Sequence, residues 1–134
     1  MSTGAVGTRQ TILCVDDSEI HCYAITRSLE HCGYATLVAH TGADAVAQAR
    51  SNKVDLVLLD INLPDIDGFE VCKRIKSDPQ TSSIPVVFHT GSSANASASL
   101  RAEIVGGAAF LTVPVDRDEL ITVIEGCLKR SRAN

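Results

Sequence analysis

The sequence predicts an α/β fold, a doubly wound five-stranded parallel sheet with helices on both faces. Five short apolar runs alternate with segments whose apolar residues recur at helical spacing. Such alternation is typical of a parallel sheet that is covered by helices. The connections are short, so right-handed crossovers leave only a few topologies. A chain of 134 residues suits one compact domain.

The five strands are predicted from runs that are mostly apolar. They occupy Thr11–Val15, Tyr34–Ala39, Asp55–Leu59, Pro85–His89 and Ala108–Thr112. The third run is nearly all apolar, as expected of a strand that is buried on both faces.

Each strand is followed by a helical pattern. The first two expected helices are Ser18–Cys32 and Thr41–Ser51, and the third passes through Phe69, Cys72 and Ile75. A weak fourth helix is expected after the loop Gly91–Ser99 and reaches about Val105. The last helix has Leu120, Ile124 and Leu128 on one face. The third helix is expected to end near Asp78, because proline disfavours helix in the residue before it. Asp116 and Glu119 form an Asp-first capping box that opens the last helix.

Composition limits the function classes. Residues 11–130 are expected to form the domain, with flexible tails at 1–10 and 131–134. The formal net charge of -4 argues against direct nucleic-acid binding, which needs a basic surface. No apolar stretch is long enough to span a membrane, and the first ten residues do not form a signal peptide. Five cysteines without a CxxC spacing favour reduced thiols over a disulfide framework or a zinc site. We therefore expect a cytoplasmic protein.

Three aspartates follow predicted strands: Asp16 and Asp17 after the first, and Asp60 after the third. In such sheets the functional site lies beyond the carboxyl ends of the strands. Each aspartate alone could be a helix cap. Together, two carboxylates 4 Å apart repel by about 4 kcal/mol near a protein surface, which favours raised pKa values or a bound cation. Oxygen ligands select a hard ion, so the pattern predicts Mg²⁺ or Mn²⁺.

A carboxylate held beside such an ion can act as a nucleophile toward phosphorus. The hydroxyl of Thr90 follows the fourth predicted strand, where it could bind a phosphoryl group or cap the next helix. The four histidines are assigned to surface or packing roles, and strand alternation turns His89 away from Thr90.

Four segments resemble the receiver domain of bacterial two-component response regulators. They are ILCVDDSE (12–19), LVLLDINLPDIDGFEVCKRIK (56–76), IPVVFHTG (84–91) and GAAFLTVPV (107–115). Their order and spacing match the family over nearly the whole chain. The resemblance implies a flavodoxin-like topology with strand order 2-1-3-4-5.

The resemblance implies a role for each aspartate. Asp60 would accept a phosphoryl group from a sensor histidine kinase or a histidine phosphotransfer protein. Asp17 would ligate the metal directly and Asp16 mainly through water, and Asp60 and the backbone carbonyl of Asn62 would complete the ligand set. No enzymatic activity is expected beyond self-catalysed phosphoryl acceptance and hydrolysis.

The resemblance also implies a switch. Thr90 would move toward the phosphoryl group and Phe110 would turn inward, while Pro64 and Gly68 shape the loop after the phosphorylated strand. The output would be a contact with a downstream protein, made by the last two helices and the strand between them. Homodimerisation is left open.

One position departs from the family pattern. Val113 stands where the family normally has a lysine before Pro114, and the bond between these two residues is often cis in the family. Valine cannot place a positive charge on the acidic cluster, so this receiver is atypical, and the rate of phosphorylation or its coupling to a conformational change is in question. Arg117 is expected to be a surface residue.

Val113 motivates a second hypothesis, a phosphorylation-independent binding module with the receiver fold. A phosphatase of the haloacid dehalogenase type is disfavoured, because its second acidic residue follows the nucleophile by two positions, where this chain has Asn62. Flavin binding is disfavoured as well, because Asp16 and Asp17 would repel phosphate where that fold needs a phosphate-cradling loop.

Overall fold

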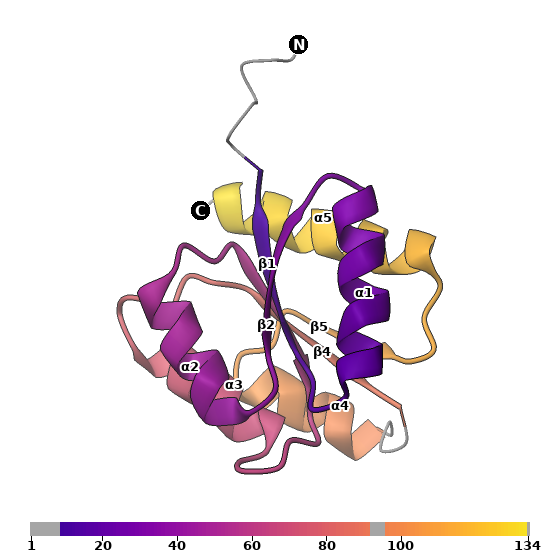
Figure 1. Ribbon diagram of the computed structural model, residues 1–134. Helices are drawn as coiled ribbons and strands as arrows, with labels where there is room; N and C mark the ends of the chain where they lie inside the picture. Colours follow the sequence, from indigo (N-terminus) through magenta and orange to yellow (C-terminus); the bar gives the residue numbers. More distant parts are fainter. Residues whose placement is uncertain (1–8, 92–95, 134) are drawn as a thin grey trace.

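Strands and helices alternate along the computed structural model, which describes residues 9–91 and 96–133 (Figure 1). The strands are β1 (Thr11–Val15), β2 (Ala35–Ala39), β3 (Leu56–Asp60), β4 (Val86–Thr90) and β5 (Ala109–Thr112). The helices are α1 (Glu19–His31), α2 (Gly42–Ser51), α3 (Gly68–Ser77), α4 (Ala96–Ile104) and α5 (Arg117–Ala133).

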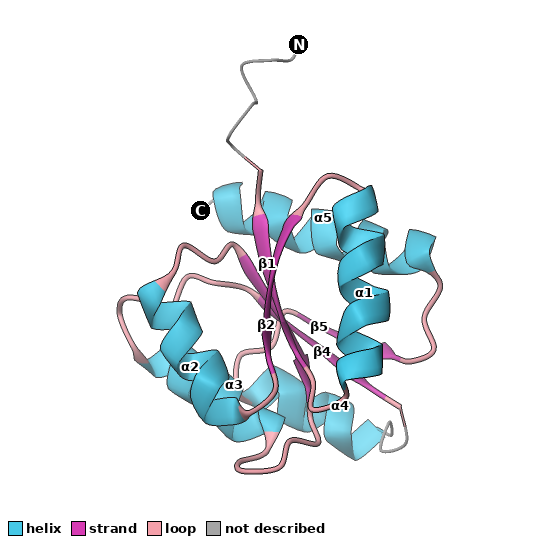
Figure 2. Ribbon diagram, viewed as in Figure 1, coloured by secondary structure: helices cyan, strands magenta, loops and turns pink. Residues whose placement is uncertain are grey.

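All neighbouring strands pair in parallel, in the order β2-β1-β3-β4-β5. Helices α1 and α5 cover one face of the sheet, and α2, α3 and α4 cover the other (Figure 2). The predicted fold class and strand order are therefore confirmed. No helix in the described part of the chain is long and apolar enough to cross a membrane.

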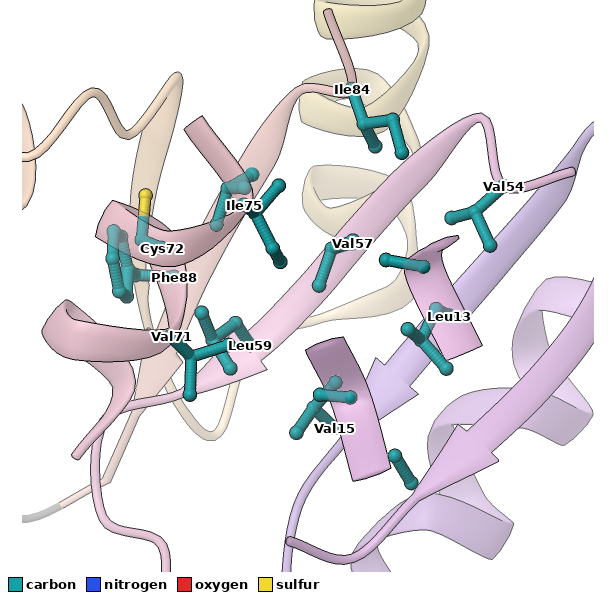
Figure 3. Close-up of a cluster of buried hydrophobic side chains, with 14 of the residues drawn as sticks. Leu13, Val15, Val54, Val57, Leu59, Val71, Cys72, Ile75, Ile84 and Phe88 are labelled. Atoms are coloured by element: carbon teal, nitrogen blue, oxygen red, sulfur yellow. The ribbon is translucent and has the colours of Figure 1, made fainter. Parts of the chain in front are cut away.

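Side chains of the central strands alternate between the two faces. On β3, Val57 and Leu59 pack with α2, α3 and α4, whereas Leu56 and Leu58 pack with α1 and α5. Figure 3 shows the first of these two layers, where side chains from β1, β3, β4 and α3 meet. The central strands are thus buried on both faces, as the apolar run of the third strand predicts.

Local hydrogen bonds set the ends of the helices. Ser18, Thr41 and Asp67 cap α1, α2 and α3, each accepting from a backbone N–H in the first turn. The Oδ1 atom of Asp116 accepts from the backbone N–H of Glu119 at 3.1 Å, which forms the Asp half of the predicted capping box. Asp78 has an extended backbone, so α3 ends before Pro79 as predicted.

Several boundaries differ from the prediction. β3 and β4 each end one residue later, because Asp60 pairs with His89 and Thr90 pairs with Thr112 in the ladder. Helix α5 runs through Ala133, although a tail is predicted from 131. In the predicted N-terminal tail, the carbonyl of Gln10 accepts from the N–H of Ala35 at 2.9 Å. Residues 1–8, and 92–95 of the predicted loop, lie outside the described residues.

Candidate functional site

The three predicted aspartates meet at the carboxyl edge of the sheet. Asp16 and Asp17 follow β1, and Asp60 is the last residue of the adjacent strand β3. One carboxylate oxygen from each lies within 4.8 Å of the others. The Asp16 side chain is buried, Asp60 is half-buried and Asp17 is exposed. The cluster is therefore open to solvent on one side and closed on the other.

Backbone N–H groups orient two of these carboxylates. The Oδ1 atom of Asp16 accepts from the N–H of Ser18 at 2.9 Å. The Oδ1 atom of Asp60 accepts from the N–H of Asn62 at 3.2 Å. Both bonds fix a carboxylate to the loop that follows its own strand, so the two side chains are held in place before any ligand binds.

Asp60 has the strongest electrostatic perturbation in the cluster. Burial, together with the charges of Asp16 and Asp17, raises its pKa from 3.8 to about 6, against a lowering contribution from the N–H of Asn62. Within the described residues, no lysine, arginine or histidine forms an ion pair with Asp17 or Asp60. The negative charges of Asp17 and Asp60 are therefore not offset by an ion pair with a basic side chain of the described residues.

This donor set fits a hard divalent cation. The carboxylate oxygens lie close enough to share one ion, and oxygen-only ligands suit Mg²⁺. Asn62 lines the same cavity, whose volume is about 420 Å³, together with Asp16, Asp60 and Thr90. Among the described residues, these three aspartates are the one cluster of potential metal ligands.

The loop after β3 packs tightly beneath Asp60. A Cβ atom placed on Gly68 would lie 2.4 Å from the carbonyl oxygen of Asp60, so only glycine fits at this position. The N–H of Gly68 donates to the carbonyl of Ile61 at 2.8 Å and closes the loop. Pro64 is exposed on the outside of the same loop. The close approach of Gly68 to Asp60 is the geometry that a loop-shaping residue needs, and the role of Pro64 stays a prediction.

Asp65 in this loop has a structural role that the sequence analysis does not predict. Its two carboxylate oxygens accept from the N–H groups of Gly42 and Ala43, at 2.8 and 2.9 Å. These bonds at the N-terminus of α2 lower the pKa of Asp65 to about 2. These hydrogen bonds therefore attach the loop that follows Asp60 to the N-terminus of α2.

Thr90 and His89 end the neighbouring strand β4. Thr90 is 1% exposed and His89 is 3% exposed. The Oγ1 atom of Thr90 and the Nε2 atom of His89 have no hydrogen-bond partner among the described residues. Both side chains line the cavity that contains Asp60.

His89 is a site residue that sequence reasoning missed. Alternation does turn its side chain away from that of Thr90, but β4 pairs with β3 so that His89 stands opposite Asp60. Residues opposite one another in a ladder project to the same face of a sheet. The assignment of His89 to a surface or packing role is therefore incomplete. The register that places it opposite Asp60 is not visible in the sequence, so no local signal identifies it.

Val113, at the position where the resemblance implies a lysine, borders the same cavity. A Cβ atom on Gly91 would lie 3.4 Å from Cγ2 of Val113, which places this glycine and this valine in direct proximity. The peptide bond between Val113 and Pro114 is cis. Arg117 is exposed, as expected, and does not line the cavity that contains Asp60.

Phe110 is half-buried on β5 and lies next to Phe88, with ring centroids 6.5 Å apart. It packs against the core layer under α2, α3 and α4. The Phe110 ring therefore lies next to β4, the strand that ends in Thr90, on the face of the sheet that α4 covers.

Comparisons with known proteins identify this arrangement. A model of the response regulator receiver domain matches residues 12–125. The chain is 38% identical to protein PilH of Pseudomonas aeruginosa over 117 residues, which cover 87% of this chain and 96% of PilH. It is 35% identical to the transcriptional regulatory protein ZraR of Salmonella typhimurium, over 90% of this chain but 27% of ZraR. Its fold matches a CheY-like receiver domain protein from Methanospirillum hungatei with a TM-score of 0.87 and 26% identity, over 93% of this chain and 98% of the other.

Proposed function

Since this chain belongs to the response regulator receiver domain family, we propose that it accepts a phosphoryl group on Asp60 and alters a protein-binding surface in response. One observation carries the proposal: the carboxylate of Asp60 shares a cavity with Asp16, Thr90 and Asn62, and its oxygen lies within 4.8 Å of those of Asp16 and Asp17. A nucleophile, a candidate cation site and a hydroxyl group for the product thus occur together.

The transfer is a displacement at phosphorus. A carboxylate oxygen of Asp60 forms a bond to the phosphorus of a phosphohistidine, and the phosphorus–nitrogen bond breaks. The electron pair of that bond remains on the imidazole nitrogen of the donor, which takes up a proton. Asp60 must be ionised to act, and with a pKa of about 6 it is mostly ionised near neutral pH. Beyond this step and hydrolysis of the product we propose no enzymatic activity.

Asp16, Asp17, Asp60 and the carbonyl of Asn62 would hold Mg²⁺ or Mn²⁺. When bound, such an ion neutralises charge on the transferring phosphoryl oxygens. The chain itself supplies the orientation: hydrogen bonds from Ser18 and Asn62 hold the carboxylates, and Gly68 lets the loop lie against Asp60.

Surface features support two kinds of protein partner. Helix α1 begins beside the aspartates and exposes Ile20 and Tyr23, to 80% and 64%. This apolar surface suits contact with a histidine kinase or a phosphotransfer protein. Helix α4 exposes Leu100 and Ile104, to 58% and 74%, which supports the α4-β5-α5 face as the contact for a downstream protein. Exposed apolar groups of this size often mark interaction surfaces. We propose that the protein acts in the cytoplasm.

The step that links the site to this face would involve Thr90 and Phe110. The Oγ1 atom of Thr90 has no partner among the described residues, so it is available to donate to a phosphoryl oxygen. Movement of Thr90 would open space on the sheet edge into which Phe110 can turn. The phosphoryl group carries about -1.5 to -2 charge near neutral pH, in place of the single negative charge of the Asp60 carboxylate, and this change of charge and shape would drive the rearrangement.

The proposal is tested by intact-mass measurement after incubation with Mg²⁺ and a small acyl phosphate, and then with a panel of phosphorylated histidine kinases. We expect one phosphoryl adduct on the wild type and none on Asp60→Asn. An adduct that persists in Asp60→Asn would place the acceptor elsewhere.

Val113 favours a second candidate function, a binding module whose surface does not respond to phosphorylation. Failure of both the acyl phosphate and the kinases to label the wild type would support it. Under the first proposal, backbone NMR shifts around Phe110 move when the wild type is treated with a phosphoryl mimic and stay unchanged in Asp60→Asn.

A further inference from the structure

A second cavity adjoins the acidic one. It has a volume of about 480 Å³ and lies between α1, the end of β4 and the segment from Val113 to Leu120. The two cavities share five lining residues: Asp16, His21, His89, Gly91 and Val113. The shared residues form one end of the second cavity, which we call the shared end.

His89 presents a hydrogen-bond acceptor at the shared end. His89 is 3% exposed, so its imidazole is almost completely removed from solvent. The imidazole also forms a hydrogen bond to the backbone carbonyl of Val15, and Nε2 has no partner in the described part of the chain. That bond therefore uses Nδ1–H, and Nε2 carries the lone pair. A buried acceptor without a donor is destabilising, so a ligand with N–H groups would stabilise it.

The other acceptor at the shared end is the carboxylate of Asp16, which is 2% exposed. Its Oδ2 atom lies 3.4 Å from Nδ1 of His21, whose side chain is 65% exposed to solvent. Two acceptors, one of them an anion, call for a donor group with positive charge. A metal ion bound by His89 is less suitable, because His89 belongs to no cluster of three potential metal ligands in the described chain.

The remaining walls are mostly apolar. They include Ala24 and Ile25 of α1, Val113, Val115, and Leu120 of α5. An alkyl chain would bury apolar surface against them. Arg117 also lines this cavity but not the acidic one, so it lies away from the shared end. Its guanidinium would repel a second ammonium group, which restricts the ligand to one cationic head.

We propose that this cavity binds a primary alkylammonium group, with the ammonium between Asp16 and His89 and the alkyl chain against Val113 and Leu120. The group can belong to a free amine or to a lysine side chain of another protein. The inference concerns binding alone and goes beyond phosphoryl acceptance.

The test is a titration of the full chain with n-butylammonium chloride, followed by backbone and imidazole NMR. We expect saturable shifts at Gly91, Val113 and Leu120, and a shift of the His89 ring signal. Tetramethylammonium chloride has the same charge and no N–H donor, so it should give no saturable shift. Linear, unsaturated shifts, or equal binding of tetramethylammonium, would overturn the proposal.

Two variants locate the site. Val113→Lys inserts a tethered ammonium into the cavity, and His89→Phe removes the acceptor, so each should weaken n-butylammonium binding at least tenfold. Thr122→Lys adds the same charge at an exposed position of α5 outside the cavity lining and should bind as the wild type does. Thermal unfolding verifies that each variant is folded. Unchanged affinity in folded Val113→Lys would contradict the proposal.

Two further experiments distinguish the source of the ammonium group and separate its binding from phosphoryl acceptance. Nα-acetyl-lysine methylamide tests a lysine side chain as the source: equal binding supports a protein-borne group, and binding of n-butylammonium alone supports a free amine. Asp60→Asn lacks the phosphoacceptor but keeps Asp16 and His89, so it should bind n-butylammonium within a few-fold of the wild type. Loss of phosphorylation therefore leaves this binding intact if the inference is correct.

Discussion

The two halves of the carboxyl edge of the sheet differ in how their polar groups are satisfied. At the ends of β1 and β3, backbone N–H groups of Ser18 and Asn62 hold the carboxylates of Asp16 and Asp60. At the end of β4, the Nε2 atom of His89 and the Oγ1 atom of Thr90 are buried without a partner among the described residues. We call these the acidic half and the β4 half.

This difference distinguishes polar groups that are held in one position from polar groups that can respond to a ligand. Groups held by their own loop keep one geometry, which suits a nucleophile and metal ligands. Buried groups without partners are stabilised when a ligand or a rearrangement supplies the missing bond. The acidic half is therefore suited to phosphoryl transfer, and the β4 half is suited to binding the phosphoryl group or a cation.

The largest effect is expected from loss of a metal ligand in the acidic half. Asp17→Ala removes an exposed carboxylate from the cluster of three, with little effect on the core. A metal ion supplies several kcal/mol to phosphoryl transfer, so Mg²⁺-dependent labelling should fall by roughly two orders of magnitude or more. The initial rate of adduct formation measures this. Unchanged labelling would show that Asp17 is not a ligand.

A second large effect is expected beneath the acidic half. In Gly68→Ala the new Cβ would meet the backbone of Asp60 and Ile61 at 2.4 and 2.8 Å, and backbone cannot move aside cheaply. We expect a loss of about 1–3 kcal/mol in the free energy of unfolding, measured in urea, together with slower labelling.

Gly126→Ala is the matched control. The nearest atom to its added Cβ is Nη1 of Arg130 at 3.5 Å, in ordinary contact. Alanine inside helix α5 should stabilise the protein by about 1 kcal/mol. Equal effects of the two substitutions would contradict the close approach of Gly68 to β3.

The acidic half and the position of Thr90 could be predicted from sequence, and the role of His89 in the β4 half could not. Asp16, Asp17 and Asp60 follow apolar strands, and the carboxyl ends of parallel strands share one edge. The role of His89 depends on strand register, which pairs it with Asp60 and which no local pattern reveals. The bonds from Asp65 to α2 span more than twenty positions in the chain and depend on how the loop folds. The sequence motifs thus predict the strand-end residues but not the contacts between distant segments.

A smaller effect concerns the stability of the acidic half without metal. The folded-state pKa of Asp60 is about 6, above the ordinary 3.8, so ionisation disfavours the folded state and stability is lost as pH rises between these values. Asp60→Asn has no such loss. After discounting for solvent screening, we expect it to be about 1–2 kcal/mol more stable than the wild type near pH 7, with the difference vanishing toward pH 4.

Urea unfolding in a chelator across this pH range measures the difference between the two proteins. Mg²⁺ binds the folded wild type and should narrow the difference at neutral pH. A difference independent of pH would mean that Asp60 does not carry the perturbed pKa.

The smallest effect is expected where the two halves meet, at Val113. The side chain is half-buried beside Gly91, and it borders both cavities. In Val113→Lys an ammonium would reach the carboxylates of the acidic half, lower the pKa of Asp60 and offset the charge of a phosphoryl group. A partly exposed ion pair is worth about 1 kcal/mol, so the phosphoryl yield or lifetime should rise by about fivefold, with Thr122→Lys unchanged. Intact-mass time courses measure both quantities. A higher phosphoryl yield or lifetime in Val113→Lys would show that the acidic half lacks a cation that the chain does not supply. An unchanged yield and lifetime would show that the site has adapted to valine and needs no added positive charge.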